Sequence, residues 1–240
     1  MAGVPEWWRY IGRRVECPVC DGRFRKWAPG EWRDGGFYGN PVRCPRCWSL
    51  PRHRVLWLYL EPRVRANDFR SILHVAPERA IAPKLERAAS RYVSADLEPG
   101  RAMVVADLTA LPFEDGSFDL LVCSHVLEHV PDDRAAMREM HRVLSPRGMA
   151  VIQTPVNYDQ EHTYENPGET DPAVRLSQFS QDDHVRVYGP DLVERLSSSG
   201  FSIDLVDPID WEPALVERHG LQPRRRSLRN DLFACRPASS

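Results

Sequence analysis

The stretch PFEDGSFDLLVCSHVLEHV, residues Pro112–Val130, decides the fold. It predicts an acidic turn and then a buried strand from Phe118 to Cys123, because an apolar run between turn residues is typical of a parallel strand covered on both faces. Polar residues follow this strand directly: Ser124, His125, Glu128 and His129. In an open α/β sheet, ligands bind beyond the carboxyl ends of the strands. We therefore expect a functional site where this strand ends.

Length and composition limit the classes of protein that fit. The chain has 240 residues, with 42% hydrophobic and 28% charged residues, which is typical of one globular α/β domain with a small additional module. No apolar run approaches the roughly 20 residues that a membrane span requires, and the N-terminus does not resemble a signal peptide. We therefore expect a cytoplasmic protein without a membrane partner; the composition does not define an oligomeric state.

Charge is divided unevenly along the chain. Residues 1–65 carry a net charge of +7 and the remainder carries −9. A basic segment of this kind is compatible with an anionic partner, but a solvated surface or docking on the protein's own acidic body is favoured.

Cysteines dominate the N-terminal segment. Cys17 and Cys20 form one C-x2-C pair and Cys44 and Cys47 a second, with 23 residues between the pairs. Zn²⁺ prefers four soft ligands in a tetrahedron, and two such pairs on tight turns supply them. Two disulfides are disfavoured in a cytosolic protein, and redox chemistry needs only one pair. We predict structural Zn²⁺, since four cysteine ligands leave no position open for catalysis. Aromatic residues nearby predict a small apolar core: Phe24, Trp27, Trp32, Phe37 and Tyr38.

Strands and helices alternate over residues 70–206. Seven strands are predicted, at residues 71–76, 91–95, 102–106, 118–123, 149–153, 201–206 and 231–235. Alternation of this kind predicts an α/β fold with a Rossmann-like, doubly wound, seven-stranded sheet. The last strand follows the sixth after 24 residues and is expected as an antiparallel insertion.

The predicted domain organisation has three parts. Residues 1–50 form the zinc-binding module, a zinc ribbon, and residues 51–69 a helical connector whose helix ends at Pro62. Residues 70–240 form the main domain. Its polar, loop-rich segment 155–190 is expected to be a substrate-side insertion, because a loop of that length in a compact domain commonly covers or binds a ligand.

Carboxylates follow three consecutive predicted strands. Glu78 comes after the first strand, Asp96 after the second and Asp107 after the third. An acid after the second strand is placed to bind the two hydroxyls of a ribose, and one after the third could accept a hydrogen bond from a purine amino group. The sequence has no Walker lysine motif and no glycine-rich phosphate loop. The series favours a nucleoside ligand without phosphates, although acids also favour strand-end turns for conformational reasons.

Residues 111–148, LPFEDGSFDLLVCSHVLEHVPDDRAAMREMHRVLSPRG, resemble the fourth-motif region and following helix of class I S-adenosylmethionine-dependent methyltransferases of the type 11 branch, with ADLTA before and MAVIQTP after. The resemblance covers about residues 70–206. It implies that Asp96 and its neighbour Leu97 hold the cofactor ribose and that Asp107 and Leu108 meet the adenine. It also places along the cofactor the residues that end the fourth strand: Cys123, Ser124 and His125.

The first strand departs from the family pattern of acid-x-Gly-x-Gly. His74 stands where the acid is usual, and Ala76 and Glu78 stand where glycines are usual. Glycines let the backbone approach the cofactor closely. We expect these three residues at the methionine end of the cofactor, with Glu78 pairing its ammonium group.

Methyl transfer to a hydroxyl or a protonated amine requires a base that removes a proton. Histidine suits this task at neutral pH. His184 is the preferred candidate, His125 is the next, and His129 is the third histidine considered. Arg186 and Tyr188 are expected to orient an anionic or hydroxylated substrate.

Three functions follow from these observations. The first is an S-adenosylmethionine-dependent methyltransferase acting at O or N of a small-molecule metabolite. The second is an RNA methyltransferase whose basic zinc module grips nucleic acid, which the pI of about 6.5 disfavours. The third is a non-catalytic zinc-ribbon adaptor whose altered first motif no longer binds the cofactor.

Overall fold

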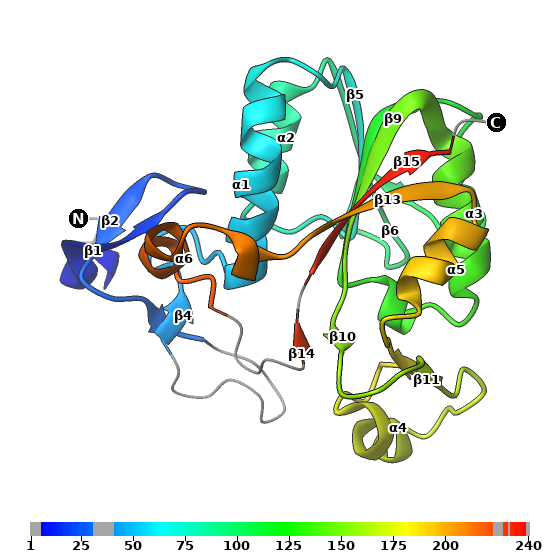
Figure 1. The fold of residues 1–240 in the computed structure, drawn as a ribbon. Coiled ribbons are helices and arrows are strands. Elements are labelled where there is room, and N and C mark those ends of the chain that lie inside the picture. The colour runs from blue at the N-terminus through cyan, green and yellow to red at the C-terminus, as the bar shows by residue number, and fades with distance from the viewer. Residues whose placement is uncertain (1–5, 31–40, 223–227, 230, 239–240) are drawn as a thin grey trace. The chain divides into compact units, whose positions relative to one another are not determined.

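The computed structural model describes residues 6–30, 41–222, 228–229 and 231–238, and these form two compact units (Figure 1). We call residues 1–63 and 207–222 the cysteine unit, and residues 64–206 and 223–240 the sheet unit. The predicted division differs from this one. It placed residues 207–222 in the main domain, whereas they pack with the N-terminal segment.

The sheet unit is built on seven strands in the order β13-β15-β9-β8-β5-β6-β7. The central strands are β5 (Ser71–Val75), β6 (Arg91–Asp96), β7 (Val104–Val105), β8 (Phe118–Ser124) and β9 (Leu144–Gln153). They pair in parallel. The edge strand β13 (Phe201–Val206) and the inserted strand β15 (Leu232–Pro237) pair antiparallel, and β15 also pairs antiparallel with β9. The predicted doubly wound sheet with an antiparallel insertion is confirmed.

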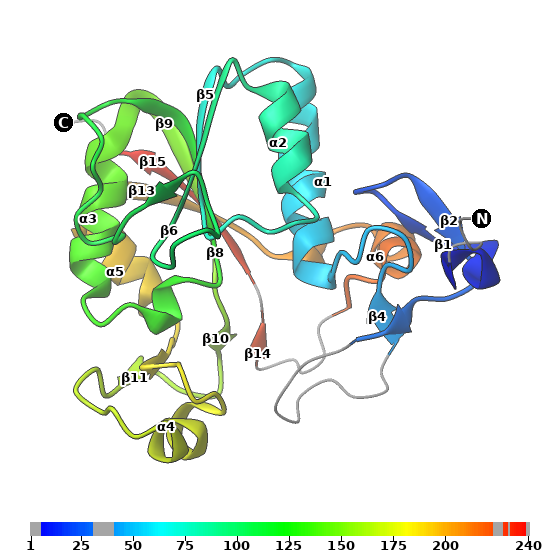
Figure 2. The ribbon, with the colours of Figure 1, turned by 180° about the vertical axis from the view of Figure 1, so that it is seen from behind.

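Helices cover both faces of this sheet (Figures 1 and 2). Helix α2 (Ala82–Ala88) lies on one face, and α3 (Asp133–Val143) and α5 (Leu192–Ser198) lie on the other. Asp132 caps α3 by accepting a hydrogen bond from the Ala135 amide at 2.9 Å, as the acid run at the predicted helix start suggested. Buried residues of α3 and α5 pack on the sheet: Ala136, Met137, Met140, Val143, Leu192 and Leu196.

The segment after β9 forms the predicted insertion beyond the carboxyl end of the sheet (Figure 1). It contains β10 (Val156–Asn157), β11 (Tyr164–Glu165), α4 (Pro172–Phe179) and β12 (Arg186–Val187). Strand β11 pairs antiparallel with β12, and β10 pairs antiparallel with β14 (Leu228–Arg229). Sequence reasoning expected loops here, so α4 and these short ladders were missed.

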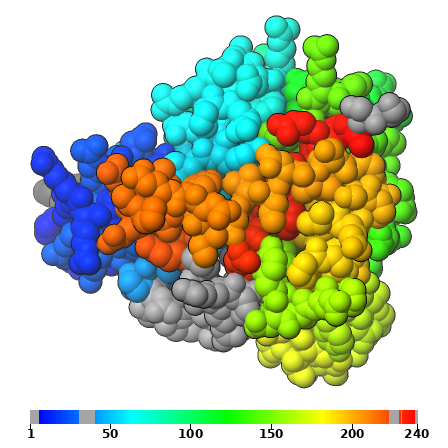
Figure 3. All heavy atoms as spheres, viewed as in Figure 1, coloured from blue at the N-terminus to red at the C-terminus, as the bar shows by residue number. Residues whose placement is uncertain are grey.

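The cysteine unit contains short antiparallel ladders and short helical segments besides the longer helix α1. Strand β1 (Ile11–Cys17) pairs with β2 (Gly22–Phe24), and β3 (Ala28–Pro29) pairs with β4 (Pro41–Arg43). The helical segments are η1 (Glu6–Tyr10), α1 (Pro51–Arg65), η3 (Pro208–Asp210) and α6 (Pro213–His219). Figure 3 shows residues of the 207–222 segment, in orange, against N-terminal residues in blue.

Helix α1 differs from its prediction. It continues through Pro62 to Arg65, whereas Pro62 was expected to end it. A proline inside a helix removes one amide donor and tends to kink or break it. Here only one further turn follows Pro62, and the Arg63 side chain donates a hydrogen bond to the Tyr59 carbonyl at 3.0 Å.

Arg54 on α1 is the central polar residue of the cysteine unit. Its side chain is fully buried and stacks over the Trp27 ring, with its Cζ 4.0 Å from the ring centroid. Its guanidinium donates hydrogen bonds at 2.6–3.0 Å to four backbone carbonyls, those of Val42, Ser49, His219 and Gly220. Arg54 therefore joins the 207–222 segment to the N-terminal ladders.

Close packing beside Arg54 also fixes the end of α6. Gly220 has φ +59°, and a Cβ atom there would lie 2.3 Å from Nε1 of Trp27. Only glycine combines the left-handed backbone with so close an approach. Phe24 and Trp27 are buried as predicted, while Trp32, Phe37 and Tyr38 lie outside the described residues.

We predict that Arg54→Met destabilises the cysteine unit by more than about 3 kcal/mol, because buried carbonyls then lack a donor. All seven tryptophans of the sequence lie in the residue ranges of the cysteine unit, so tryptophan fluorescence during urea unfolding measures its stability separately. Arg63→Met, on the same helix, is the control and should cost less than about 1 kcal/mol. Equal losses in the two variants would contradict the assigned role of Arg54.

Candidate functional site

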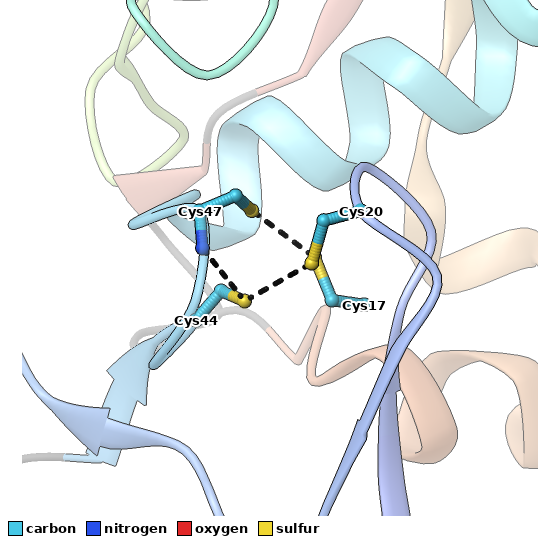
Figure 4. Close-up of side chains that lie close together, drawn as sticks. All are labelled: Cys17, Cys20, Cys44 and Cys47. Atoms are coloured by element: carbon cyan, nitrogen blue, oxygen red, sulfur yellow. Dashed lines mark hydrogen bonds between the residues drawn. The ribbon is translucent and has the colours of Figure 1, made fainter. Parts of the chain in front are cut away.

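The four predicted cysteine ligands lie together in the cysteine unit (Figure 4). The Sγ atoms of Cys17 and Cys47 are 3.6 Å apart, and so are those of Cys20 and Cys44. A tetrahedral ZnS₄ centre with bonds of about 2.3 Å has sulfur–sulfur separations of roughly 3.8 Å, so the cluster fits zinc. All the cysteines are free, and none forms a disulfide.

Neighbouring groups suit a negatively charged zinc–thiolate centre. The Cys47 amide lies 3.5 Å from Sγ of Cys44, and Ser49 Oγ lies 3.2 Å from Sγ of Cys17. Burial lowers the pKa of Arg54 to about 10, and the negative charge of the four cysteines opposes this shift. Arg54 therefore stays protonated at neutral pH and supplies positive charge beside the cluster.

A second group of polar residues lies where β5, β6 and β7 end, in the sheet unit. The parallel register pairs Val75 with Ala95 and Asp96 with Val105, so the residues that follow these strands share one edge of the sheet. The Ala76 amide donates a hydrogen bond to the Ala95 carbonyl at 2.8 Å. The order predicted from the sequence, first, second and third strand, is therefore also the order in space.

His74 and Glu78 form a hydrogen-bonded pair after β5. His74 is fully buried, with Nε2 2.8 Å from a Glu78 carboxylate oxygen and Nδ1 3.0 Å from the Tyr92 hydroxyl. Burial raises the pKa of Tyr92, so its hydroxyl keeps its proton and can donate to Nδ1. His74 then donates from Nε2 and fixes the carboxylate at the end of the first strand.

Asp96 and Asp107 are held by the turns that follow their strands. Asp96 accepts a hydrogen bond from the Glu98 amide at 2.9 Å, and Asp107 accepts from the amide and hydroxyl of Thr109 at 2.8 and 2.7 Å. Leu97, beside Asp96, is 68% exposed, whereas Leu108 is buried. An exposed leucine next to a strand-end acid offers an apolar surface for a flat ring.

Two backbone positions at this edge are strained. Ala76 has φ +46° and His125 has φ +55°, in the left-handed region that non-glycine residues rarely adopt. Val75 and Cys123, which pair in register on β5 and β8, precede them closely. Such strain persists where the surrounding structure imposes it, commonly at functional sites. At Ala76 the strain also explains why glycine is usual there in the resembling family.

The end of β8 carries a buried carboxylate, Glu128, in the helical turn η2 (Leu127–His129). One of its oxygens lies 3.1 Å from Nδ1 of His125, and the other accepts a hydrogen bond from the Thr154 hydroxyl at 2.9 Å. Burial alone would raise the pKa of Glu128, but the hydrogen bond and charges of His125 and the charge of His129 lower it to about 2. Glu128 is therefore ionised. Ser124 beside it is buried, with Oγ 3.5 Å from the Gln153 side chain.

His184, predicted as the base, lies near this carboxylate on the insertion. It is 5% exposed, and burial lowers its pKa to about 4. Its ring packs edge-on against that of His129 with centroids 4.6 Å apart. The next amide, of Val185, donates a hydrogen bond to the Glu128 carbonyl at 3.0 Å.

Arg186 and Tyr188 lie inside the protein. Arg186 is 1% exposed and donates hydrogen bonds to the carbonyls of Leu127 and Pro131, at 2.8 and 2.9 Å, and also to that of Val130. Tyr188 is fully buried, and burial raises its pKa, so its hydroxyl donates to Asp133 at 2.8 Å.

Carboxylates complete this buried network. Glu165 lies 3.1 Å from Nε of Arg186 and 2.8 Å from Nη2 of Arg195, and Arg195 also contacts Asp133 at 3.1 Å. The hydrogen bond from Arg195 lowers the pKa of Glu165, and Arg186 lowers it further. Burial opposes this shift. Sequence reasoning placed Glu128 in the expected site but did not foresee its Thr154 partner or this network. The LEH triplet after β8 was the sequence signal for Glu128. The partners of Arg186 are too distant from it in sequence to be predicted.

The sheet order and the strand-end acids define a Rossmann-like domain suited to a nucleoside cofactor. Residues 74–152 match the family model described as a methyltransferase domain. This match supports the predicted methyltransferase domain over residues 74–152, and the sheet has the Rossmann-like order that the prediction requires.

Curated relatives match shorter stretches. Demethylmenaquinone methyltransferase of Staphylococcus epidermidis is 49% identical over 49 residues, 20% of either chain. The Staphylococcus aureus protein of the same name is 36% identical over 86 residues, 32% of this chain and 36% of that one. The matches thus span about a fifth to a third of these relatives.

Solved structures share the fold. An S-adenosylmethionine-dependent methyltransferase from Mesorhizobium loti has a TM-score of 0.50 at 19% identity, over 74% of this chain and 97% of that one. The [4+2]-cyclase SpnF has a TM-score of 0.52 at 16% identity, over 93% and 92%. Within the described part of the chain, no helix is long and apolar enough to cross a bilayer.

We predict that Cys44→Ser abolishes zinc retention, because three thiolates and a hydroxyl hold Zn²⁺ far more weakly than four thiolates. The measurement is the zinc released when a mercurial reagent titrates the thiols. About one equivalent is expected from the wild type and none from the variant. Cys235→Ala removes a buried thiol of the sheet unit and is the control. Full zinc release from Cys44→Ser would exclude this residue as a ligand.

Proposed function

We propose that the chain transfers a methyl group from S-adenosylmethionine to an oxygen or nitrogen atom of a small molecule. One observation carries the proposal: Glu78, Asp96 and Asp107 follow three neighbouring parallel strands at one edge of the sheet, inside the segment that matches a methyltransferase domain. This arrangement offers separate groups to the amino-acid, ribose and adenine parts of one cofactor.

The cofactor contacts follow from this order. Asp96 accepts hydrogen bonds from the ribose hydroxyls, and the exposed side chain of Leu97 packs against the base. Asp107 and Leu108 meet the adenine. His74 holds Glu78 at 2.8 Å, and its carboxylate pairs with the ammonium group of the methionine part. Glu78 thus replaces the acid that position 74 lacks, while Ala76 keeps the left-handed backbone that glycine would adopt there.

His125 is better suited than His184 to act as the base. Glu128 holds its Nδ1 at 3.1 Å, so Nε2, which is itself buried in the protein, is the nitrogen left to take up a proton. His184 is buried, and a base with a pKa of about 4 accepts protons poorly at neutral pH. Arg186 and Tyr188 are buried and paired within the protein, so we assign them to positioning the insertion instead of contacting substrate.

The reaction balances with these groups. The acceptor oxygen or nitrogen attacks the methyl carbon as the sulfonium–carbon bond breaks, and S-adenosylhomocysteine leaves. The acceptor's proton passes to Nε2 of His125, and Glu128 stabilises the resulting imidazolium. The acceptor therefore carries a hydroxyl or an amine. The names of the curated relatives support a small molecule.

We predict that Asp96→Ala weakens S-adenosylmethionine binding at least tenfold, because a bidentate contact to the ribose is lost, and that Asp107→Ala weakens it less. The measurement is isothermal titration calorimetry on zinc-loaded protein. Asp204→Ala, on the distant edge strand β13, is the control and should bind as the wild type does. Absence of binding by the wild type would favour a non-catalytic adaptor instead.

A separate prediction concerns the chemical step. His125→Asn should lower the methylation rate by about 10²- to 10⁴-fold while cofactor affinity changes less than threefold, since general-base catalysis contributes that much. The assay follows labelled methyl groups into a panel of small hydroxylated and amine compounds and, separately, into RNA. Labelling of RNA alone would replace the small-molecule proposal with an RNA methyltransferase. Equal rates in His125→Asn and the wild type would exclude His125 as the base.

A further inference from the structure

Glu128, His129 and His184 bring one carboxylate and two imidazoles together beside the proposed acceptor position. Their ligand atoms all lie within 4.8 Å of one another. This group is separate in sequence and chemistry from the four cysteines. In the described residues, these three side chains and the four cysteines are the two groups of histidine, cysteine or acidic side chains with such proximity.

We propose that these three residues bind a divalent transition-metal ion. Two imidazoles and one carboxylate are a donor set that suits Zn²⁺, Fe²⁺ or Co²⁺ and leaves coordination positions open for water or substrate. Ligands bonded at about 2.0–2.2 Å to a tetrahedral ion lie roughly 3.4 Å apart, which small side-chain rotations reach from the observed spacing.

The backbone holds the three ligands in place from two distant segments. Glu128 and His129 belong to η2, and His184 precedes the Val185 amide that donates to the Glu128 carbonyl at 3.0 Å. Arg186 ties the same segments together through the carbonyls of Leu127 and Pro131. The site is therefore built by the fold.

Outer contacts orient two of the ligands. His129 has Nδ1 3.3 Å from the Asp183 carbonyl and 3.4 Å from the Asp183 carboxylate, which leaves Nε2 for an ion. Metal-binding histidines commonly contact a carboxylate or carbonyl in this way. Glu128 accepts from Thr154, and a carboxylate with about four lone-pair sites can accept from Thr154 and His125 and still bind an ion.

The side chain of His129 is 32% exposed, so an ion can reach the cluster from solvent. Bound next to His125, an ion with open positions would coordinate an acceptor oxygen and make its proton easier to remove. That role rests on the proposed methyl transfer, whereas ion binding itself does not.

The test titrates Co²⁺ into untagged, zinc-loaded, full-length protein, with calorimetry and visible absorption as readouts. The wild type should bind one further equivalent with cobalt d–d bands and no thiolate charge-transfer band. His129→Asn, His184→Asn and Glu128→Gln should each weaken this binding at least tenfold, and Asp183→Asn by about 10- to 100-fold. His162→Asn, an exposed histidine of the same insertion, is the matched control and should bind unchanged.

Absence of a further equivalent in the wild type would overturn the inference, and so would equal binding by wild type and the ligand variants. Near-ultraviolet circular dichroism of each variant identifies any that fails to fold, and the wild-type titration decides the question without them. S-adenosylmethionine binding is measured on the same samples. Cofactor binding without cobalt binding would contradict the metal site but not the proposed methyl transfer. Cobalt binding without cofactor binding would contradict the proposed methyl transfer but not the metal site.

Discussion

One requirement governs how the insertion packs in the sheet unit: the buried guanidinium of Arg186 must find hydrogen-bond acceptors and an opposite charge. A charged group without water must find hydrogen-bond acceptors and opposite charge within the protein. Carbonyls of residues 127, 130 and 131 supply the acceptors, and Glu165 supplies the charge. The requirement fixes the insertion on the turn after β8. For this reason His184 meets Glu128 and His129, which are distant from it in sequence.

The cysteine unit solves the same problem with Arg54. Among the described residues, its hydrogen-bond acceptors are four carbonyls, and the Trp27 ring and the cysteines lie nearby. A zinc–tetrathiolate centre carries a charge of −2, which the guanidinium partly offsets. A buried arginine and a cysteine cluster therefore support each other. The 207–222 segment closes the arginine's shell, which explains why it packs with the N-terminus.

Local signals made most of the fold predictable. The strands at residues 71–75, 91–96, 118–124 and 201–206 appear within about two residues of their predicted bounds, because buried parallel strands read as apolar runs between turn residues. The four cysteines met as their spacing predicted. The features that local signals did not reveal depended on distant partners. Arg186 and Tyr188 were expected to face a substrate, yet their acceptors lie some 55–60 positions away. Residues 207–222 carried no local sign of their partner, since the contacts of His219 reach Glu16.

Two strained backbone positions coincide with the sheet edge that carries the candidate site. Ala76 and His125 adopt left-handed conformations just beyond Val75 and Cys123, which are partners on adjacent strands. Each such conformation costs roughly 1–2 kcal/mol, so two at one edge need a compensating reason. At Ala76 the turn brings the backbone toward the position of a cofactor, and at His125 it aims an imidazole held by Glu128. In the proposed function, a part of the cofactor and the proton acceptor would lie on these neighbouring strands, as in-line transfer between a bound donor and an acceptor requires.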